Sequence, residues 1–516
     1  MHARIDEGAS AARLSLLASA AVVALWTVLQ PHTADLAAQV YRTGLFERAG
    51  WVLWDNNWFG GHHLPGYSLF TPWLMAHLGI GVTGAIAAAT TTLGFAAIVR
   101  VKRRERWLWP TAWVAWAAAG DLLIGRVTYS VGLALAVLAV LVLVLERRMP
   151  VACVLGALSA AASPVAGLFL AMVVTVWWTV EHRREMLAVA ACSCTVIVAC
   201  ALLFGDGGAQ PYATGAAAFA VAIALALRLG VARDALLARR ALMAYAVVAA
   251  VSWLLPTPMG SNIARLGVAF AVPVVLVARR RLPGAYFCAV GIAAAAWLVF
   301  APATEIAKSL DAPETHARYY APLIAQLQRR DATSGRVEIV PSATRWETVY
   351  VGARFALARG WETQIDHARN RLFYAPKLSV ARYVRWLRFN AVKYVALSHA
   401  PKERWGRNEE KLVRRGVPGL RLAWTSADWR LYVLRAPRPL ASGAVVRHLG
   451  VDRIILHAAA PSTIVLRVHW SRYWHGDQGV CIARRSDGFM DVTVPRAAMV
   501  TLKASPTSPV ARSPGC

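Results

Sequence analysis

The sequence predicts a mainly α-helical, polytopic membrane protein with about eleven transmembrane helices, followed by a C-terminal extracytoplasmic part that combines an α/β domain with a small β-sandwich. Three observations lead to this fold class. Only 16% of the 516 residues are charged and 57% are hydrophobic, whereas soluble proteins carry about 25% charged residues. Apolar runs of membrane-spanning length recur up to residue 302. Beyond that point, short helix and strand patterns alternate.

The transmembrane prediction follows from these runs, because a helix needs about 20 apolar residues to cross the hydrocarbon core. The first run, 14–29, precedes many further spans and no small-residue cleavage pattern follows it, so it is expected to be a transmembrane helix and not a removable signal. The runs on either side of Pro164 are short and form either two spans or one broken hairpin. The expected spans centre on residues 13–30, 81–99, 107–124, 128–146, 150–163, 165–181, 186–204, 211–228, 241–255, 265–278 and 284–301.

Lys and Arg set the expected orientation, since cytoplasmic loops retain them. One set of alternate loops holds 18 of these residues, and the opposite set holds four, namely Arg42, Arg48, Arg126 and Arg265. This asymmetry predicts a plasma-membrane protein with a cytoplasmic N-terminus, and an odd number of spans then places residues from about 303 onward outside. The tail carries 34 Lys and Arg against 16 Asp and Glu. A solvated surface, an anionic lipid surface or an anionic envelope polymer accounts for this charge, and nucleic acid is not an expected partner.

The first outer loop, residues 31–80, is longer than the others, and such loops often carry function. Thr33 can cap a short helix beginning near Ala34, on which Asp35, Gln39 and Arg42 share one face. A carboxylate would thereby be held on an ordered element at the membrane surface. The structural alternative is that Asp35 only complements the dipole at the helix N-terminus.

The second half of this loop concentrates polar and aromatic residues. It includes Asp55, His62, His63 and Tyr67 within the run WDNNWFGGHHLPGYSLFTP. Carboxylates, imidazoles and stacking aromatics next to lipid suit a polar substrate handled at the membrane face. Two structural alternatives stay open, because tryptophans also form interfacial belts and the histidines can simply be polar loop residues.

Several segments carry a family resemblance. They are the first span, His32, Asp35, the run from Trp54 to Pro72, TPMGSNIARLG from Thr257 to Gly267, and the tail segments ARGWETQIDHARNRLFY and YVRWLRFNAVKYVALS. Together they resemble the GT-C superfamily of polytopic glycosyltransferases and uncharacterised bacterial relatives, some of them described as related to 6-pyruvoyl-tetrahydropterin synthase.

The resemblance implies transfer of a sugar from a polyprenyl-phosphate donor in the outer leaflet to a cell-envelope acceptor, normally with inversion. On this interpretation Asp35 is the catalytic base. Arg126 and Arg265, with Asn262 beside the second, are candidates for binding the lipid phosphate, and the alternative for both arginines is snorkelling to headgroups. The remaining substrate-binding candidates are Asp55, His62, His63 and Tyr67.

The sequence departs from the family pattern in one respect. Many members have adjacent or nearly adjacent acidic residues in the first outer loop, whereas Leu36 follows Asp35. No cofactor is therefore certain, and a divalent metal site would need Asp55 to fold back and supply a second carboxylate. The alternative function is a transporter or a non-catalytic assembly factor for envelope polysaccharide or lipid. Only one acidic residue, Asp121, lies well inside an expected span, and no internal repeat is found, which favours surface chemistry over transport.

After residue 303 the alternating pattern predicts a small layered α/β domain over residues 303–440. Its expected helices are 319–329, 380–389 and 408–415, and its expected strands are 337–340, 393–397 and 429–434. Short strands at 454–456, 463–468 and 490–494 predict a small β-sandwich over 441–504. Residues 505–516, which hold three prolines and three serines, are expected to be disordered.

The charge asymmetry makes a topology prediction. A reporter fused after Lys308 should be extracytoplasmic, and a reporter fused after Arg104 should be cytoplasmic, because Lys and Arg stay in cytoplasmic loops. Paired alkaline phosphatase and green fluorescent protein fusions measure this. A cytoplasmic signal from the Lys308 fusion would mean that the number of spans before it is even.

Overall fold

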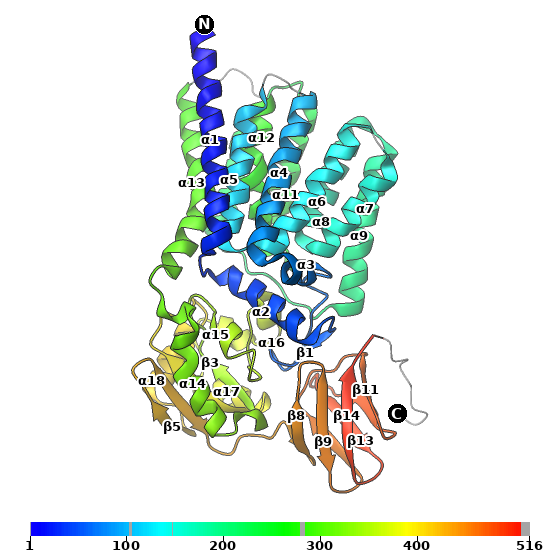
Figure 1. Cartoon of the computed structure of the whole chain (residues 1–516), viewed down its shortest axis with the longest axis vertical. Coiled ribbons are helices and arrows are strands. Elements are labelled where there is room, and N and C mark those ends of the chain that lie inside the picture. Colours follow the sequence, from blue (N-terminus) through cyan, green and yellow to red (C-terminus); the bar gives the residue numbers. More distant parts are fainter. Residues whose placement is uncertain (1, 103–105, 147, 279–283, 507–516) are drawn as a thin grey trace. The chain divides into compact units, whose positions relative to one another are not determined.

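The computed structural model describes residues 2–102, 106–146, 148–278 and 284–506, and its contacts divide the chain into two compact units (Figure 1). The first unit comprises Met1–Gln39 and Gly66–Leu310, and the second comprises Val40–Pro65 and Asp311–Cys516. The predicted boundary at residue 303 lies close to the last division, but the middle of the predicted outer loop belongs to the second unit. Residues 507–516 of the predicted disordered tail lie outside the described residues, as do the arginines at 103, 104, 147 and 279–281.

The first unit is helical. Its elements are α1 (His2–Leu29), the start of α2 (Ala34–Ala49), α3 (Thr71–Leu78), α4 (Ile80–Lys102), α5 (Leu108–Ile124), α6 (Val127–Val144), α7 (Met149–Ala162), α8 (Pro164–Glu181), α9 (Arg184–Phe204), α10 (Thr214–Leu229), α11 (Leu236–Leu254), the 3-10 turn η2 (Gly260–Ile263), α12 (Ala264–Ala278) and α13 (Gly284–Ser309).

Within the described part of the chain, eight helices are long and apolar enough to cross a membrane. α7 and α10 are also apolar, but they have only 14 and 16 residues. At 1.5 Å per residue they measure about 21 and 24 Å, which is less than the roughly 30 Å of hydrocarbon in a bilayer. The helices therefore support the predicted membrane class, whereas the expected count of about eleven spans is not confirmed.

The predicted break at Pro164 is present. α7 ends at Ala162, Ser163 is extended with φ −151° and ψ 113°, and Pro164 is the first residue of α8. Proline disfavours the helical conformation in the residue before it, while its own fixed φ suits the first helical turn. The chain consequently forms two helices here.

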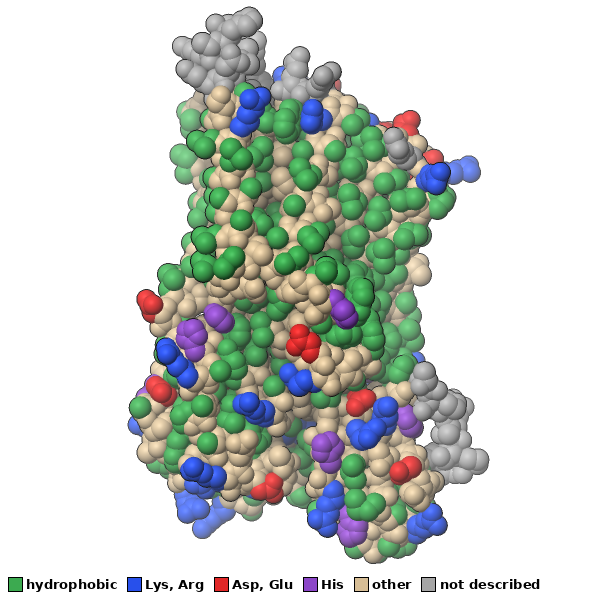
Figure 2. All heavy atoms as spheres, in the orientation of Figure 1, with side chains coloured by type: hydrophobic (Ala, Val, Ile, Leu, Met, Phe, Trp, Pro, Cys, Tyr) green, Lys and Arg blue, Asp and Glu red, His purple; other side chains and the backbone are tan. Residues whose placement is uncertain are grey.

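Hydrophobic side chains cover the visible outer face of the first unit's helices, and Lys and Arg gather at the end near the N-terminus (Figure 2). Val28, Leu93, Leu202 and Ile292 illustrate this exposure, at 79%, 69%, 70% and 71% of each residue's surface. Apolar surface of this extent is unfavourable in water and is typical of contact with lipid. The first unit thus has the surface of a membrane domain.

The α/β part of the second unit is built on a mixed sheet with the strand order β3-β4-β6-β5. Strands β3 and β4 are parallel, and the other pairs are antiparallel. The elements of this part are η3 (Pro313–Thr315), α14 (Ala317–Arg329), η4 (Ala332–Ser334), β3 (Arg336–Ile339), α15 (Glu347–Tyr350), α16 (Thr363–Arg369), η5 (Arg371–Tyr374), α17 (Val380–Phe389), β4 (Val392–Ser398), α18 (Arg407–Arg415), β5 (Leu420–Thr425) and β6 (Trp429–Leu434).

Helices cover both faces of this sheet. Alternate residues of a strand point to opposite faces, so Trp429 and Leu434 of β6 lie on different faces. Trp429 packs against Tyr319 of α14. Leu434 shares a core with Tyr383 of α17 and Val413 of α18. The sheet therefore lies between α14 on one face and the α17–α18 pair on the other. The three helices and three strands expected from the sequence are all present in this layered domain.

The last part of the second unit is a β-sandwich of two four-stranded antiparallel sheets, with the orders β12-β13-β10-β7 and β11-β14-β9-β8. Both sheets contribute to one apolar core, which includes Leu456 of β9 and Val492 of β13. The strands are β7 (Ala441–Ser442), β8 (Val445–Leu449), β9 (Arg453–Ala458), β10 (Ser462–Leu466), β11 (Trp474–Gly476), β12 (Cys481–Arg484), β13 (Met490–Val494) and β14 (Ala498–Ala504).

The segment Val40–Pro65 is an integral part of the second unit. It continues α2 and then forms a two-stranded ribbon of β1 (Trp54–Asp55) and β2 (His62–His63). Trp54 and Trp58 are fully buried, and Trp54 joins the sandwich core beside Trp474. Gly61 has φ +103°, and a Cβ there would lie 2.3 Å from the Trp54 ring, so glycine is required where the ribbon turns over the indole. The alternative of an interfacial tryptophan belt is therefore wrong for these two residues.

Replacing Trp54 with alanine should destabilise the second unit by about 3–5 kcal/mol, because it leaves a large cavity in a closed core. Trp51 is 65% exposed, and its replacement by alanine should cost less than about 0.5 kcal/mol. Denaturant unfolding of the purified full-length protein measures both effects. Equal stabilities of the two variants would contradict the burial of Trp54.

Candidate functional site

The first unit places three charged side chains together. Asp35 lies at the N-terminus of α2, Asp121 in the last turn of α5, and Arg126 immediately before α6. The Arg126 guanidinium bridges two carboxylates, with Nε 2.9 Å from Asp35 Oδ2 and Nη1 3.2 Å from Asp121 Oδ1. The side chains of Asp35, Arg126 and Asp121 are 26%, 22% and 12% exposed. The predicted base Asp35 and the predicted phosphate ligand Arg126 are thus in direct contact, and both are partly exposed.

Local backbone geometry makes this contact possible. Gly125, between α5 and α6, has φ +89°, and a Cβ there would lie 2.6 Å from both the amide nitrogen and the Cβ of Leu36. Only glycine allows the α5–α6 turn to approach the first turn of α2 so closely. The Thr33 hydroxyl donates a hydrogen bond to the Ile124 carbonyl at 2.5 Å, which ties the residue before α2 to the same turn.

A buried hydrogen-bond network fixes the next turn of α2. The Gln39 amide donates to the Tyr67 hydroxyl at 3.0 Å and accepts from the Thr128 hydroxyl at 2.6 Å. Thr128 Oγ1 lies 3.2 Å from Thr71 Oγ1. Gln39 is 1% exposed, so these bonds stabilise a polar group that burial alone would disfavour. The predicted substrate ligand Tyr67 thereby has a structural role next to Asp35, four residues from Gln39 on the same helix.

Arg265 of α12 contributes the second cationic group predicted to bind phosphate. Its guanidinium lies over the Tyr129 ring, 5.1 Å from the centroid, and no described carboxylate lies within ion-pair distance of it. The Tyr129 hydroxyl is buried and has no hydrogen-bond partner among the described residues. Asn262, in η2, is 8% exposed, and its amide donates to the Pro258 carbonyl at a long 3.5 Å. Arg265 and Asn262 are therefore the less constrained of the predicted ligands.

The other predicted site residues belong to the second unit, where Asp55 is fully buried. Its carboxylate accepts hydrogen bonds from the Tyr41 hydroxyl at 2.8 Å and the Asn57 N–H at 2.8 Å. Burial raises the pKa of Asp55 to about 6, although both hydrogen bonds oppose the shift. These partners of Asp55 belong to the second unit, whereas Asp35 lies in the first, and the suggestion that Asp55 folds back to complete a metal site with Asp35 stays a prediction.

The histidine pair also has structural partners. His62 is fully buried, stacks on Trp58 and lies 3.6 Å from Glu362, which forms an ion pair with Arg42. His63 Nε2 lies 2.8 Å from Ser471 Oγ of the sandwich. These contacts favour the structural alternative for both histidines. Arg42 was expected on the same face of the helix as Asp35. Its guanidinium donates a hydrogen bond to Glu362, which lies 320 positions away in the sequence.

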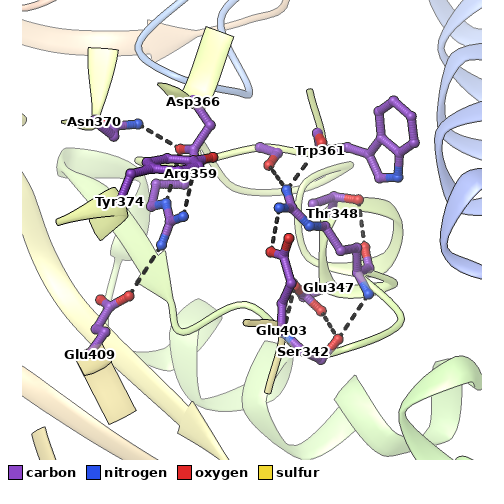
Figure 3. Close-up of polar contacts among 12 residues, drawn as sticks. Ser342, Glu347, Thr348, Arg359, Trp361, Asp366, Asn370, Tyr374, Glu403 and Glu409 are labelled. Carbon is purple, nitrogen blue, oxygen red and sulfur yellow. Dashed lines mark hydrogen bonds and ion pairs between the residues drawn. The ribbon is translucent and has the colours of Figure 1, made fainter. Parts of the chain in front are cut away.

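A buried ionic cluster in the α/β domain was not singled out from the sequence (Figure 3). Arg359 donates two hydrogen bonds to Asp366, at 2.9 and 2.6 Å, and one to Glu409 at 3.3 Å. Asn370 and Tyr374 also donate to Asp366. Glu338 completes the cluster, 3.9 Å from Arg359 Nη1. These residues span 72 positions without a spacing pattern, so the sequence offered no signal for them.

The cluster holds three carboxyl groups and one guanidinium, and its protonation reflects that imbalance. Burial alone would raise the pKa of Asp366, but contact with Arg359 lowers it. Burial raises the pKa of Glu409 to about 7. Burial and the neighbouring Glu409 raise the pKa of Glu338 well above its usual range.

A hollow beside Arg359, lined also by Glu347 and Gly360, has room for about one water molecule. The cluster is therefore structural in character and not a substrate site.

No protein-family model matches the chain, and no curated protein matches its sequence. Among the described residues, no group of three or more His, Cys, Asp or Glu side chains is placed to hold a metal ion. The functional assignment therefore rests on the Asp35–Arg126–Asp121 cluster and on Arg265.

The Glu409 carboxyl makes the stability of the second unit depend on pH. The unfolded chain releases this proton near the ordinary pKa of 4.5, whereas the folded chain keeps it up to about pH 7. The free energy of unfolding should therefore fall as pH rises through this window, by at most about 1.4 kcal/mol per pH unit, and level off above it. Denaturant unfolding at pH 5, 6, 7 and 8 measures the slope.

Glu409→Gln should make that slope shallower, because the amide does not titrate and can still accept a hydrogen bond from Tyr383, while Asp55 and Glu338 keep their own contributions. Glu410→Gln is the matched control on the same helix, since Glu410 pairs with Arg414 at the surface. Identical pH profiles for wild type and Glu409→Gln would show that Glu409 does not hold the proton.

Proposed function

We propose that this protein is a membrane glycosyltransferase, which transfers a sugar from a polyprenyl-phosphate donor to a cell-envelope acceptor on the outer face of the plasma membrane. The observation that carries the proposal is the partly exposed carboxylate of Asp35, held 2.9 Å from Arg126 at one end of the apolar helices. Such a reaction requires a carboxylate as general base and a cationic group such as a guanidinium for the leaving phosphate, both accessible on a unit that faces lipid.

In this reaction Asp35 is the general base. It accepts the proton of the acceptor hydroxyl while the hydroxyl oxygen attacks the anomeric carbon from the face opposite the leaving group. The bond between the anomeric carbon and the phosphate oxygen breaks, and its electron pair leaves with the lipid phosphate. Attack from the opposite face inverts the configuration at the anomeric carbon. The Arg126 ion pair supports this role by fixing the orientation of the carboxylate.

The leaving phosphate needs cationic or hydrogen-bonding stabilisation. Arg265 is suited to this task because it forms no ion pair with a carboxylate of the described residues and lies over the Tyr129 ring. A bound phosphate would supply the missing anion and would also give the buried Tyr129 hydroxyl an acceptor. The split of 18 against four Lys and Arg supports placing this end of the helices outside the cytoplasm.

One observation favours the alternative of a non-catalytic assembly factor. Arg126 compensates the charges of both Asp35 and Asp121, and a mutually satisfied ion pair at a helix junction can be purely structural. Activity and stability must therefore be measured on the same variant.

Replacing Asp35 with asparagine should lower turnover by about 10² to 10⁴, because the amide keeps the shape and one hydrogen bond but cannot accept the proton. Protein level and donor binding should persist. Transfer from a panel of labelled polyprenyl-phosphate sugars, measured with purified protein in lipid, reports turnover, and thermal unfolding reports stability. Near-normal transfer by Asp35→Asn would remove the catalytic assignment.

Two control variants separate chemistry from folding. Glu47→Gln changes an exposed carboxylate of the same helix and should leave both turnover and melting temperature unchanged. Asp55→Asn should reduce turnover less than Asp35→Asn, because Asp55 is fully buried with its own partners. If Asp35→Asn lowered the melting temperature but kept its specific activity, a structural role costing about 0.5–2 kcal/mol would account for Asp35.

A further inference from the structure

We propose that α17 and α18 form a basic face that docks on an anionic phospholipid surface. The basic face is defined by seven exposed side chains, namely Arg382, Arg385 and Arg388 on α17 and Arg407, Lys411, Arg414 and Arg415 on α18. The docking does not depend on the chemistry proposed at Asp35, since the two features share no residue.

The two helices present these charges together because they pack on the same side of the sheet. The Tyr383 hydroxyl of α17 donates to Glu409 of α18 at 2.8 Å, and both helices contribute to one apolar core. Each helix turns its apolar residues inward and its basic residues outward. Successive turns of both helices therefore expose Arg or Lys on the same side of the sheet.

The positive charge of this face is largely uncompensated. Glu410 pairs with Arg414, while Glu409 is buried and Glu403 forms an ion pair with Arg345. The other six residues of the basic face make no ion pair with a carboxylate of the described chain. Three further exposed basic residues flank the face, namely Arg371, Lys377 and Arg404.

Two features favour a lipid surface over another anionic partner. The second unit is joined to the apolar helices where the chain passes between units, near Gln39, Pro65 and Leu310, so a bilayer containing those helices is always at high effective concentration. Trp405 is partly buried beside the face, with Arg404 4.8 Å from its ring centroid. Tryptophan and arginine together are typical of the headgroup region.

Arginine also suits this partner chemically. Six of the seven residues are Arg, whose planar guanidinium binds phosphate in a bidentate manner and is more weakly hydrated than the lysine ammonium. Each basic residue close to an anionic membrane shifts the docking equilibrium by roughly fivefold. Several acting together are enough to hold the face on the lipid, and salt should weaken the contact.

Arginine footprinting of the full-length protein in nanodiscs tests the proposal. The rates at which phenylglyoxal modifies Arg382, Arg385 and Arg388 are compared, by peptide mass spectrometry, between discs of phosphatidylcholine and discs containing phosphatidylglycerol. We expect these rates to fall about fivefold or more in the anionic discs and to recover in 0.5 M salt. Arg447 and Arg453, exposed on the sandwich, are internal controls whose rates should not change.

The triple variant R382E/R385E/R388E provides a second readout. In this variant the modification rate of Arg407 should become independent of the lipid, whereas the matched variant R447E/R453E should behave as wild type. Equal rates of the wild-type arginines in both kinds of disc would overturn the proposal. Protection that arises only on adding soluble poly(glycerol phosphate), and not with anionic lipid, would also overturn it in favour of a polymer-binding face.

Discussion

The burial of Trp54 and Trp58 determines how the chain is divided. Both indoles are fully removed from solvent inside the second unit, and each buries roughly 150–250 Å² of surface, which makes them dominant contributors to a core of this size. The segment Val40–Pro65 therefore belongs with residues that begin more than 240 positions further along the chain, at Asp311. The polar residues near the tryptophans follow from this, since Asp55 bonds to Tyr41, His63 to Ser471, and His62 stacks on Trp58, all within the same unit.

The first unit obeys a different constraint. Its helices expose apolar side chains, so charged groups are stable only where they are paired or reach the ends of the helices. Arg126 satisfies both conditions, since it precedes α6 and bridges Asp35 and Asp121. Arg265 satisfies only one, because its guanidinium lies over an aromatic ring and the carboxylates of Asp35 and Asp121 act on it without forming an ion pair. This difference makes Arg265 the residue at which an anionic ligand would add most.

The second unit shows that buried charge is not by itself a sign of a catalytic site. Arg359 is enclosed by Asp366, Glu409 and Glu338, so one guanidinium faces three carboxyl groups, and burial favours the protonated form of the two glutamates. Such clusters contribute little net stability, because desolvation offsets the attraction between charges, but breaking one is costly. Their usual consequence is a strict geometry, and here Arg359 joins the segment between α15 and α16 to α16 itself and to α18.

The sequence by itself determined the apolar helices, the layered α/β domain and three strands of the sandwich, because these depend on local periodicity. Helix Val380–Phe389 and strand Trp429–Leu434 begin and end where the sequence pattern placed them. It also brought out Asp35, Arg126 and Arg265 as candidates. The partners of these residues, the assignment of Val40–Pro65 to the second unit and the cluster at Arg359 were decided only by the tertiary structure. Each depends on contacts between distant residues, such as Asp35 with Arg126 or Arg42 with Glu362, and local periodicity carries no information about such pairs.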